Sequence, residues 1–151
     1  MVNMNNFETT VVAIPDIADG YCKGLRALGA NSSVVSVKSP KMIDGSVNID
    51  NCTQKLYPND NRWDYVLSYK GEAYFVEVHP ATEGEVKVME AKLNWLKKWL
   101  NNQAELLDDY PKGKPRFTWV HSGKCGILKT SKEYKKAAAL GLVLKNSLSL
   151  E

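Results

Sequence analysis

Two strand-like runs in the middle of the chain constrain the fold more than any other feature. RWDYVLSY (62–69) and EAYFVEVH (72–79) are separated by Lys70-Gly71, which predicts a β-hairpin with a two-residue loop, or a four-residue loop in the same register. Apolar residues occur at both alternating sets of positions, so both faces of the hairpin are expected to be covered. The hairpin is therefore predicted to lie in the centre of a sheet. One face is predicted to carry Trp63, Tyr65, Leu67, Tyr74, Val76 and Val78, and the other Asp64, Val66, Ala73, Phe75, Glu77 and His79.

The segments before the hairpin predict one helix and one or two short strands. Apolar residues recur at helical spacing between 17 and 28, and Gly29 follows where a C-terminal glycine cap is expected. SVVSVK (33–38) is β-branched, and the next strand-like segment, 43–50, contains the turn signal Asp44-Gly45. The polar segment 51–62 predicts a loop with at most a turn of helix.

The segments after the hairpin predict a long helix, a strand, a short helix and an edge strand. Thr82 and Glu85 form a T-x-x-E capping box at the start of a helix over 82–108, whose Leu and Met stripe should cover the sheet. RFTWVHS (116–122) predicts the next strand. A second T-x-x-E at Thr130 starts a helix through Leu140, and LVLK (142–145) predicts the edge strand.

Composition indicates one domain of mixed helix and strand, over residues 1–149. The 151 residues and 44% hydrophobic content suffice for one core, and a net charge of +3 neither requires nor excludes a nucleic-acid partner. Three widely spaced cysteines predict free thiols in a reducing cytoplasm. No apolar run is long enough to span a bilayer, and Leu150-Glu151 is interpreted as a cloning scar.

Asp64 and Glu77 are predicted to face each other directly across the hairpin. Cβ atoms at such a position lie about 4.5–5.5 Å apart, where like charges destabilise a sheet. A bridging Mg²⁺ or Mn²⁺ ion, a shared proton, or a nearby lysine or arginine would each offset the repulsion. The interpretation that competes with a metal site is a strand-end acid pair neutralised by lysines.

His79 lies on the same predicted face, two residues beyond Glu77. Its unperturbed pKa near 6.5 would let it deprotonate a water or contact a phosphate, and a histidine bonded to backbone is the competing interpretation. Lys92, Lys97 and Lys98 on the long helix are interpreted as a solvated face in preference to a stripe that tracks DNA.

This part of the chain resembles the PD-(D/E)xK, or restriction-endonuclease-like, nuclease superfamily. In that pattern, an acid in one strand is followed by a hairpin, by an acid-x-base tripeptide that ends the next strand, and by a helix. The matching residues are Asp64 and Glu77-Val78-His79, within an order of elements αβββαβ followed by a C-terminal helix and an edge strand. The resemblance implies a central mixed sheet flanked by helices, and a divalent metal held by Asp64, Glu77 and the Val78 carbonyl. The family has lysine where this chain has His79, and Trp63 replaces the proline before the first acid.

The resemblance therefore implies a Mg²⁺- or Mn²⁺-dependent endonuclease, or a nuclease-like protein that binds DNA or RNA. Asp64, Glu77 and His79 are the expected catalytic residues. The rival hypothesis is a non-catalytic domain of the same fold that binds a protein partner in mobile-element or defence biology. Metal binding distinguishes the two, because a ligand that binds only the native state stabilises it.

Overall fold

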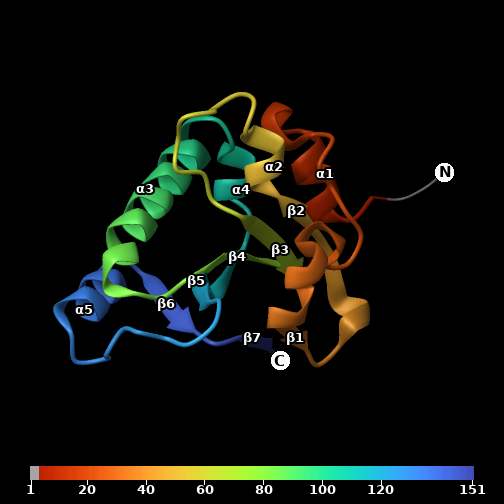
Figure 1. Cartoon of the computed structure of the whole chain (residues 1–151). Helices are drawn as coiled ribbons and strands as arrows, with labels where there is room; N and C mark the ends of the chain where they lie inside the picture. Colours follow the sequence, from red (N-terminus) through yellow and green to blue (C-terminus); the bar gives the residue numbers. More distant parts are fainter. Residues whose placement is uncertain (1–3) are drawn as a thin grey trace.

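The computed structural model describes residues 4–151 and contains a mixed five-stranded sheet in the order β2-β3-β4-β5-β6. β2 (Ile43–Asn48), β3 (Tyr65–Tyr69) and β4 (Glu72–His79) form an antiparallel meander, while β5 (Lys112–His121) and β6 (Leu142–Lys145) run parallel to β4 (Figure 1). The prediction of a mixed helix-and-strand fold with a central hairpin is confirmed.

Helices cover one face of this sheet. They are α1 (Asn6–Val12), α2 (Ile49–Thr53), α3 (Val86–Asn102), α4 (Glu105–Asp108) and α5 (Lys132–Ala139). The chain also contains four 3₁₀ turns in the described residues, which are η1 (Pro15–Ile17), η2 (Arg26–Val34), η3 (Pro40–Met42) and η4 (Glu83–Glu85). The opposite face is covered by η2 and by a small parallel sheet of β1 (Val35–Val37) and β7 (Leu148–Leu150). Both faces of the hairpin are therefore buried, as its sequence pattern predicts.

The hairpin has the predicted two-residue loop. Lys70 and Gly71 both have positive φ angles, 51° and 76°, as a type I′ turn requires. Pairing runs from Tyr69 opposite Glu72 to Tyr65 opposite Val76, which is the predicted register. This register brings the backbone just before β3 level with Glu77.

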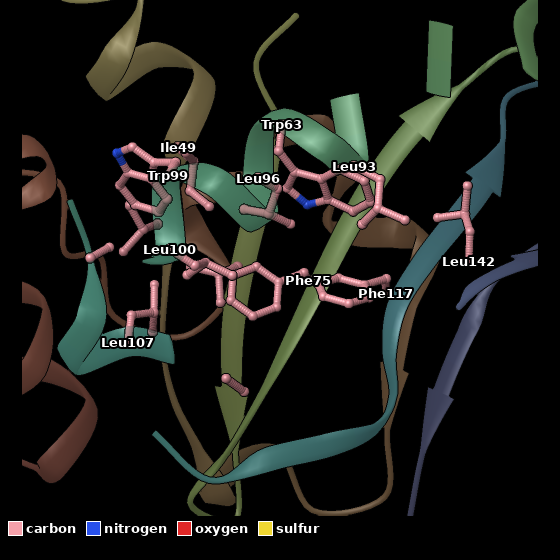
Figure 2. Close-up of a cluster of buried hydrophobic side chains, with 14 of the residues drawn as sticks. Ile49, Trp63, Phe75, Leu93, Leu96, Trp99, Leu100, Leu107, Phe117 and Leu142 are labelled. Atoms are coloured by element: carbon pink, nitrogen blue, oxygen red, sulfur yellow. The ribbon is translucent and has the colours of Figure 1, made fainter. Parts of the chain in front are cut away.

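The core on the helical face joins the sheet to the stripe of α3. Leu93 and Leu96 are fully buried and pack with Phe75 and Phe117 of the neighbouring strands (Figure 2). Trp63 lies in this same cluster, so its predicted place on the opposite face is wrong. Trp63 precedes β3, where strand alternation no longer fixes side-chain direction, and its Nε1 donates to the carbonyl of Tyr65 at 3.0 Å.

The N-terminal part differs most from the sequence-based expectation. The predicted helix over 17–28 is absent from the described chain, and only 3₁₀ turns form there, whereas α1 begins earlier with Asn5 as its N-cap. Gly24 has a φ of +55°, which interrupts helical geometry, and a Cβ on Gly20 would lie 2.4 Å from Cys52 Sγ. Tertiary contact therefore overrides the apolar spacing.

The predicted turn at Asp44-Gly45 is also wrong, because β2 continues through it with a bulge. Gly45 has a φ of +146°, and an added Cβ would collide with the ring of Tyr21. The Asp44 carboxylate instead accepts hydrogen bonds from Ser68 and from the backbone of Gly71, at 2.8 and 2.9 Å. Asp44 thus ties β2 to the hairpin loop.

The C-terminal elements agree more closely with the prediction. The helix expected over 82–108 is divided into α3 and α4, and Thr82 makes no side-chain cap. The cap of α5 is Ser131, one residue after the predicted Thr130. Leu150, part of the dipeptide interpreted as a cloning scar, pairs with Val37 and is buried. Among the described residues, no helix is both long and apolar enough to cross a bilayer.

Leu93→Ala is expected to lower the free energy of unfolding by about 2–5 kcal/mol, because it leaves a cavity between α3 and the sheet. Leu106→Ala on α4 is the matched control, since Leu106 is 54% exposed and Leu93 fully buried. Chemical denaturation measures both variants. Equal losses in the two would contradict the packing of α3 on the sheet.

Candidate functional site

Asp64 lies one residue before β3, at the point where the chain leaves the α2 region. Its carbonyl accepts hydrogen bonds from the backbone of Ile49 and Asp50, at 2.8 and 3.3 Å, so the first turn of α2 holds this position. The buried ring of Trp63 fixes the preceding residue in the core. The Asp64 backbone is therefore held by hydrogen bonds from α2 and by the burial of the preceding residue.

Glu77 lies in β4 opposite Asp64, and its side chain is only 1% exposed. Glu77 Oε1 accepts the backbone N–H of Asp64 at 3.0 Å, and Asp64 Oδ2 accepts the backbone N–H of Val78 at 3.2 Å. Each carboxylate is thus bound by the backbone of the opposite strand. The structure brings together the two acids that the sequence predicts to face each other.

Lys92 of α3 provides the nearest positive charge. Its Nζ lies 3.2 Å from Glu77 Oε2 and donates to the carbonyl of Arg62 at 3.1 Å. The Lys92 side chain is only 16% exposed, so its assignment to a solvated face is wrong. Lys97 and Lys98 are exposed, as expected. A lysine beside the acid pair, one of the three alternatives that the sequence leaves open, is thus present in the structure.

The pKa of Glu77 is raised well above its usual value. Burial is the largest cause, and the negative charge of Asp64 raises the pKa further, while Lys92 acts in the opposite direction. The upward direction of the pKa shift shows that burial and the charge of Asp64 act on Glu77 more strongly than Lys92 does. An additional cation beside Glu77 would favour the ionised carboxylate.

His79 ends β4 and continues the line of titratable groups. Its Nε2 lies 2.8 Å from Glu85 Oε2, and its Nδ1 lies 3.8 Å from Glu77 Oε2. Its carbonyl accepts hydrogen bonds from Trp119 Nε1 and the Ser122 backbone, at 3.0 and 3.2 Å. Glu85 therefore orients an imidazole instead of closing the predicted capping box, because its carboxylate is engaged by His79.

The resemblance implies three oxygen donors for a divalent cation at this end of the sheet. The carboxylates of Asp64 and Glu77 supply two of them. The third is the Val78 carbonyl, and the N–H of the same residue donates to Asp64 Oδ2 at 3.2 Å. Mg²⁺ is commonly held by one or two carboxylates together with waters. Residues 4–151 contain no group of three or more His, Cys, Asp or Glu side chains placed to hold a metal, so this site depends on the backbone carbonyl.

Lys92 and Glu85 are the site residues that the sequence did not assign. Both come from the segment after β4, and both flank the apolar stripe of the helix: Met89 lies four residues after Glu85 and three before Lys92. On a helix, residues three and four apart share a face. Charged residues at stripe-flanking positions are the signal that could have identified them.

Comparison with known proteins adds no assignment, because no family model, curated protein or solved structure matches this chain. Function is therefore argued from the geometry of the site.

Glu77→Gln is expected to flatten the dependence of unfolding free energy on pH. Because the pKa of Glu77 is raised in the folded chain, its contribution to stability is complete below the unfolded pKa of about 4.3 and is lost as the pH rises through the folded pKa. Urea denaturation in EDTA between about pH 4 and pH 8 measures this change. Glu72→Gln, an exposed position of the same strand, should keep the unmodified slope. Parallel curves for Glu77→Gln and the unmodified chain would contradict the assignment.

Proposed function

We propose that this chain is a nuclease of the restriction-endonuclease-like class, which hydrolyses phosphodiester bonds in DNA or RNA with Mg²⁺ or Mn²⁺. The observation that carries the proposal is the meeting of Asp64, Glu77 and Lys92 at one end of the β3–β4 pair. The order α1, β2-β3-β4, α3, β5 supports it, since an antiparallel meander followed by a crossover helix and a parallel strand agrees with the αβββαβ order of that class.

Asp64, Glu77 and the Val78 carbonyl would hold the metal. A bound Mg²⁺ or Mn²⁺ supplies positive charge that stabilises the transition state at phosphorus and lowers the pKa of a bound water. The raised pKa of Glu77 supports this role, because a buried carboxylate beside a second acid gains most from an added cation. The chain's own side chains then provide charge and proton transfer around the reacting phosphate.

Lys92 supplies the ammonium that the resemblance places at the position of His79. It reaches Glu77 from α3 instead of from the strand, and its Nζ lies beside the carboxylate. An ammonium there stabilises negative charge that develops on the phosphate oxygens. It also balances the charge of the acid pair when no metal is bound.

In this proposal, His79 accepts the proton of the attacking water. The Glu85 carboxylate at Nε2 favours the tautomer that carries its proton on Nε2, which leaves the Nδ1 lone pair on the side of Glu77. The water oxygen forms a bond to phosphorus while its proton passes to Nδ1, and the sugar oxygen leaves phosphorus and takes a proton from solvent. Glu85 acts as a positioning residue, because it holds the ring.

Asp64→Asn is expected to abolish the rise in melting temperature that Mn²⁺ causes in the unmodified chain, because it removes one of two anionic ligands. Asp109→Asn, an exposed position, should keep the full rise. Thermal melting with increasing Mn²⁺, supported by calorimetry, measures the effect. An unmodified chain that binds no Mn²⁺ at about millimolar concentration would refute the nuclease and favour the protein-binding domain of the same fold.

His79→Ala is expected to keep Mn²⁺ binding and to lose DNA or RNA cleavage by a factor of about 10²–10⁴, the usual range for general acid–base catalysis. Lys92→Met should tighten Mn²⁺ binding, since it removes a competing cation from Glu77, and should still reduce cleavage. Single-turnover cleavage of plasmid DNA and of RNA measures both variants. Mn²⁺ binding without cleavage of either substrate would mean that the fold persists here without its chemistry.

A further inference from the structure

A second polar feature lies beside the acid pair, at the carboxyl ends of the parallel strands β5 and β6. It is a pocket of about 540 Å³, and we call it the β5–β6 pocket. His121 at the end of β5 and Lys145 at the end of β6 line it, together with Lys129 and Tyr134 from the intervening segment. In open sheets of parallel strands, ligands bind outside the carboxyl ends of the strands. Its volume lies within the usual range for small-molecule sites.

The charge of the β5–β6 pocket is of one sign. Lys129 and Lys145 carry positive charge and His121 adds an imidazole, and no acidic side chain belongs to the lining as far as residues 4–151 are concerned. Lys145 is partly buried, yet neither it nor Lys129 forms a salt bridge with any residue that the structure describes. Two unpaired ammonium groups around one cavity favour an anionic ligand.

The other lining groups indicate a ligand that is larger than an inorganic anion. Ile127 and Leu144 give the β5–β6 pocket apolar surface, and Tyr134 gives it an aromatic ring, which is the type of group on which nucleobases stack. Ser147 adds a hydroxyl group for hydrogen bonding. Phosphate, sugar and base of a nucleotide together require this combination of cationic, polar and apolar surface.

The β5–β6 pocket is held in place next to the acid site. His121 pairs with His79 in the parallel register of β4 and β5, so the two histidines lie on adjacent strands with side chains on the same face. The loop after His121 is joined to the end of β4 by two hydrogen bonds, from Ser122 to the His79 carbonyl at 3.2 Å and from Gly126 to the Ala81 carbonyl at 2.7 Å. Chain packing leaves little room at Gly126, where an added Cβ would lie 3.3 Å from the same carbonyl.

We propose that the β5–β6 pocket binds a nucleoside phosphate, with Lys129, Lys145 and His121 contacting the phosphate and the apolar side contacting the nucleoside. The ligand is either a free nucleotide or the phosphorylated end of a nucleic-acid strand. The pocket needs neither a metal nor the acid pair. Its occupation is therefore independent of the proposed nuclease activity, although a strand end bound here would extend toward His79.

Calorimetry in EDTA on the Asp64→Asn chain tests this proposal without contribution from the acid site. dAMP is expected to bind, inorganic phosphate to bind more weakly, and deoxyadenosine to show no binding. Equal affinity for dAMP and deoxyadenosine, or for dAMP and phosphate, would overturn the proposal, as would no binding of dAMP. The proposed nuclease could fail its own metal and cleavage tests without affecting this result.

Variants of Lys145 connect the binding to the pocket. Lys145→Gln should weaken dAMP binding about tenfold or more, as expected for loss of a charged hydrogen bond, and Lys145→Arg should retain most of it. Lys135→Gln is the matched control, because Lys135 is an exposed lysine of α5 outside the pocket lining. Equal affinities for the Lys145→Gln and Lys135→Gln chains would overturn the assignment.

Two oligonucleotides that differ only in a 5′-phosphate identify the source of the ligand. Displacement of dAMP by the phosphorylated strand alone would assign the pocket to strand ends. Displacement by neither strand would assign it to free nucleotides. Displacement by both strands with equal affinity would show that the pocket does not recognise a terminal phosphate, and would overturn the proposal for strand ends.

Discussion

The buried carboxylate of Glu77 is the constraint on which the centre of this structure depends. A carboxylate that is 1% exposed loses its hydration, and that loss must be offset by hydrogen bonds and opposite charge. Here a partial offset comes from two elements, the Asp64 backbone before β3 and the Lys92 ammonium of α3, and the pKa of Glu77 stays raised despite them. Lys92 also binds the carbonyl of Arg62, so the same ion pair connects β4, α3 and the segment that leads into β3.

The sequence predicts the hairpin and α3 correctly because their signals are local. Lys70-Gly71 adopts the positive φ angles of a two-residue turn, and this loop alone sets the register that places Asp64 opposite Glu77. The apolar residues of α3 recur at helical spacing, and they form the stripe that covers the sheet. The N-terminal part is not predicted from the sequence, because Cys52 limits the space at Gly20 and Tyr21 limits the space at Gly45. Both contacts join residues that are distant in the sequence. The pairing of β7 with β1 joins residues that are 113 positions apart in the sequence, so it has no local signal either.

The acid pair was predictable from pairing geometry, whereas its partners were not. Lys92 and Glu85 approach the strand from the helical layer, and their positions depend on the rotation and depth at which α3 packs on the sheet. The apolar stripe predicts that rotation only when the sheet surface beneath the helix is also known. The sequence therefore predicts a solvated Lys92 and a capping role for Glu85, although both side chains contact residues of β4 in the structure.

The local arrangement of charge is more informative than the net charge of +3. At one end of the sheet, the acidic site at the β3–β4 pair adjoins the basic β5–β6 pocket across the paired residues His79 and His121. A phosphate chain is repelled by two carboxylates unless a cation lies between them, and it is attracted by the lysines of the neighbouring pocket. In the two proposals made above, the pocket binds a phosphate without metal, whereas the acid pair accepts one only when a metal adds to the positive charge of Lys92. Phosphate binding in the β5–β6 pocket would then need no metal, whereas phosphodiester cleavage at the acid pair would require one.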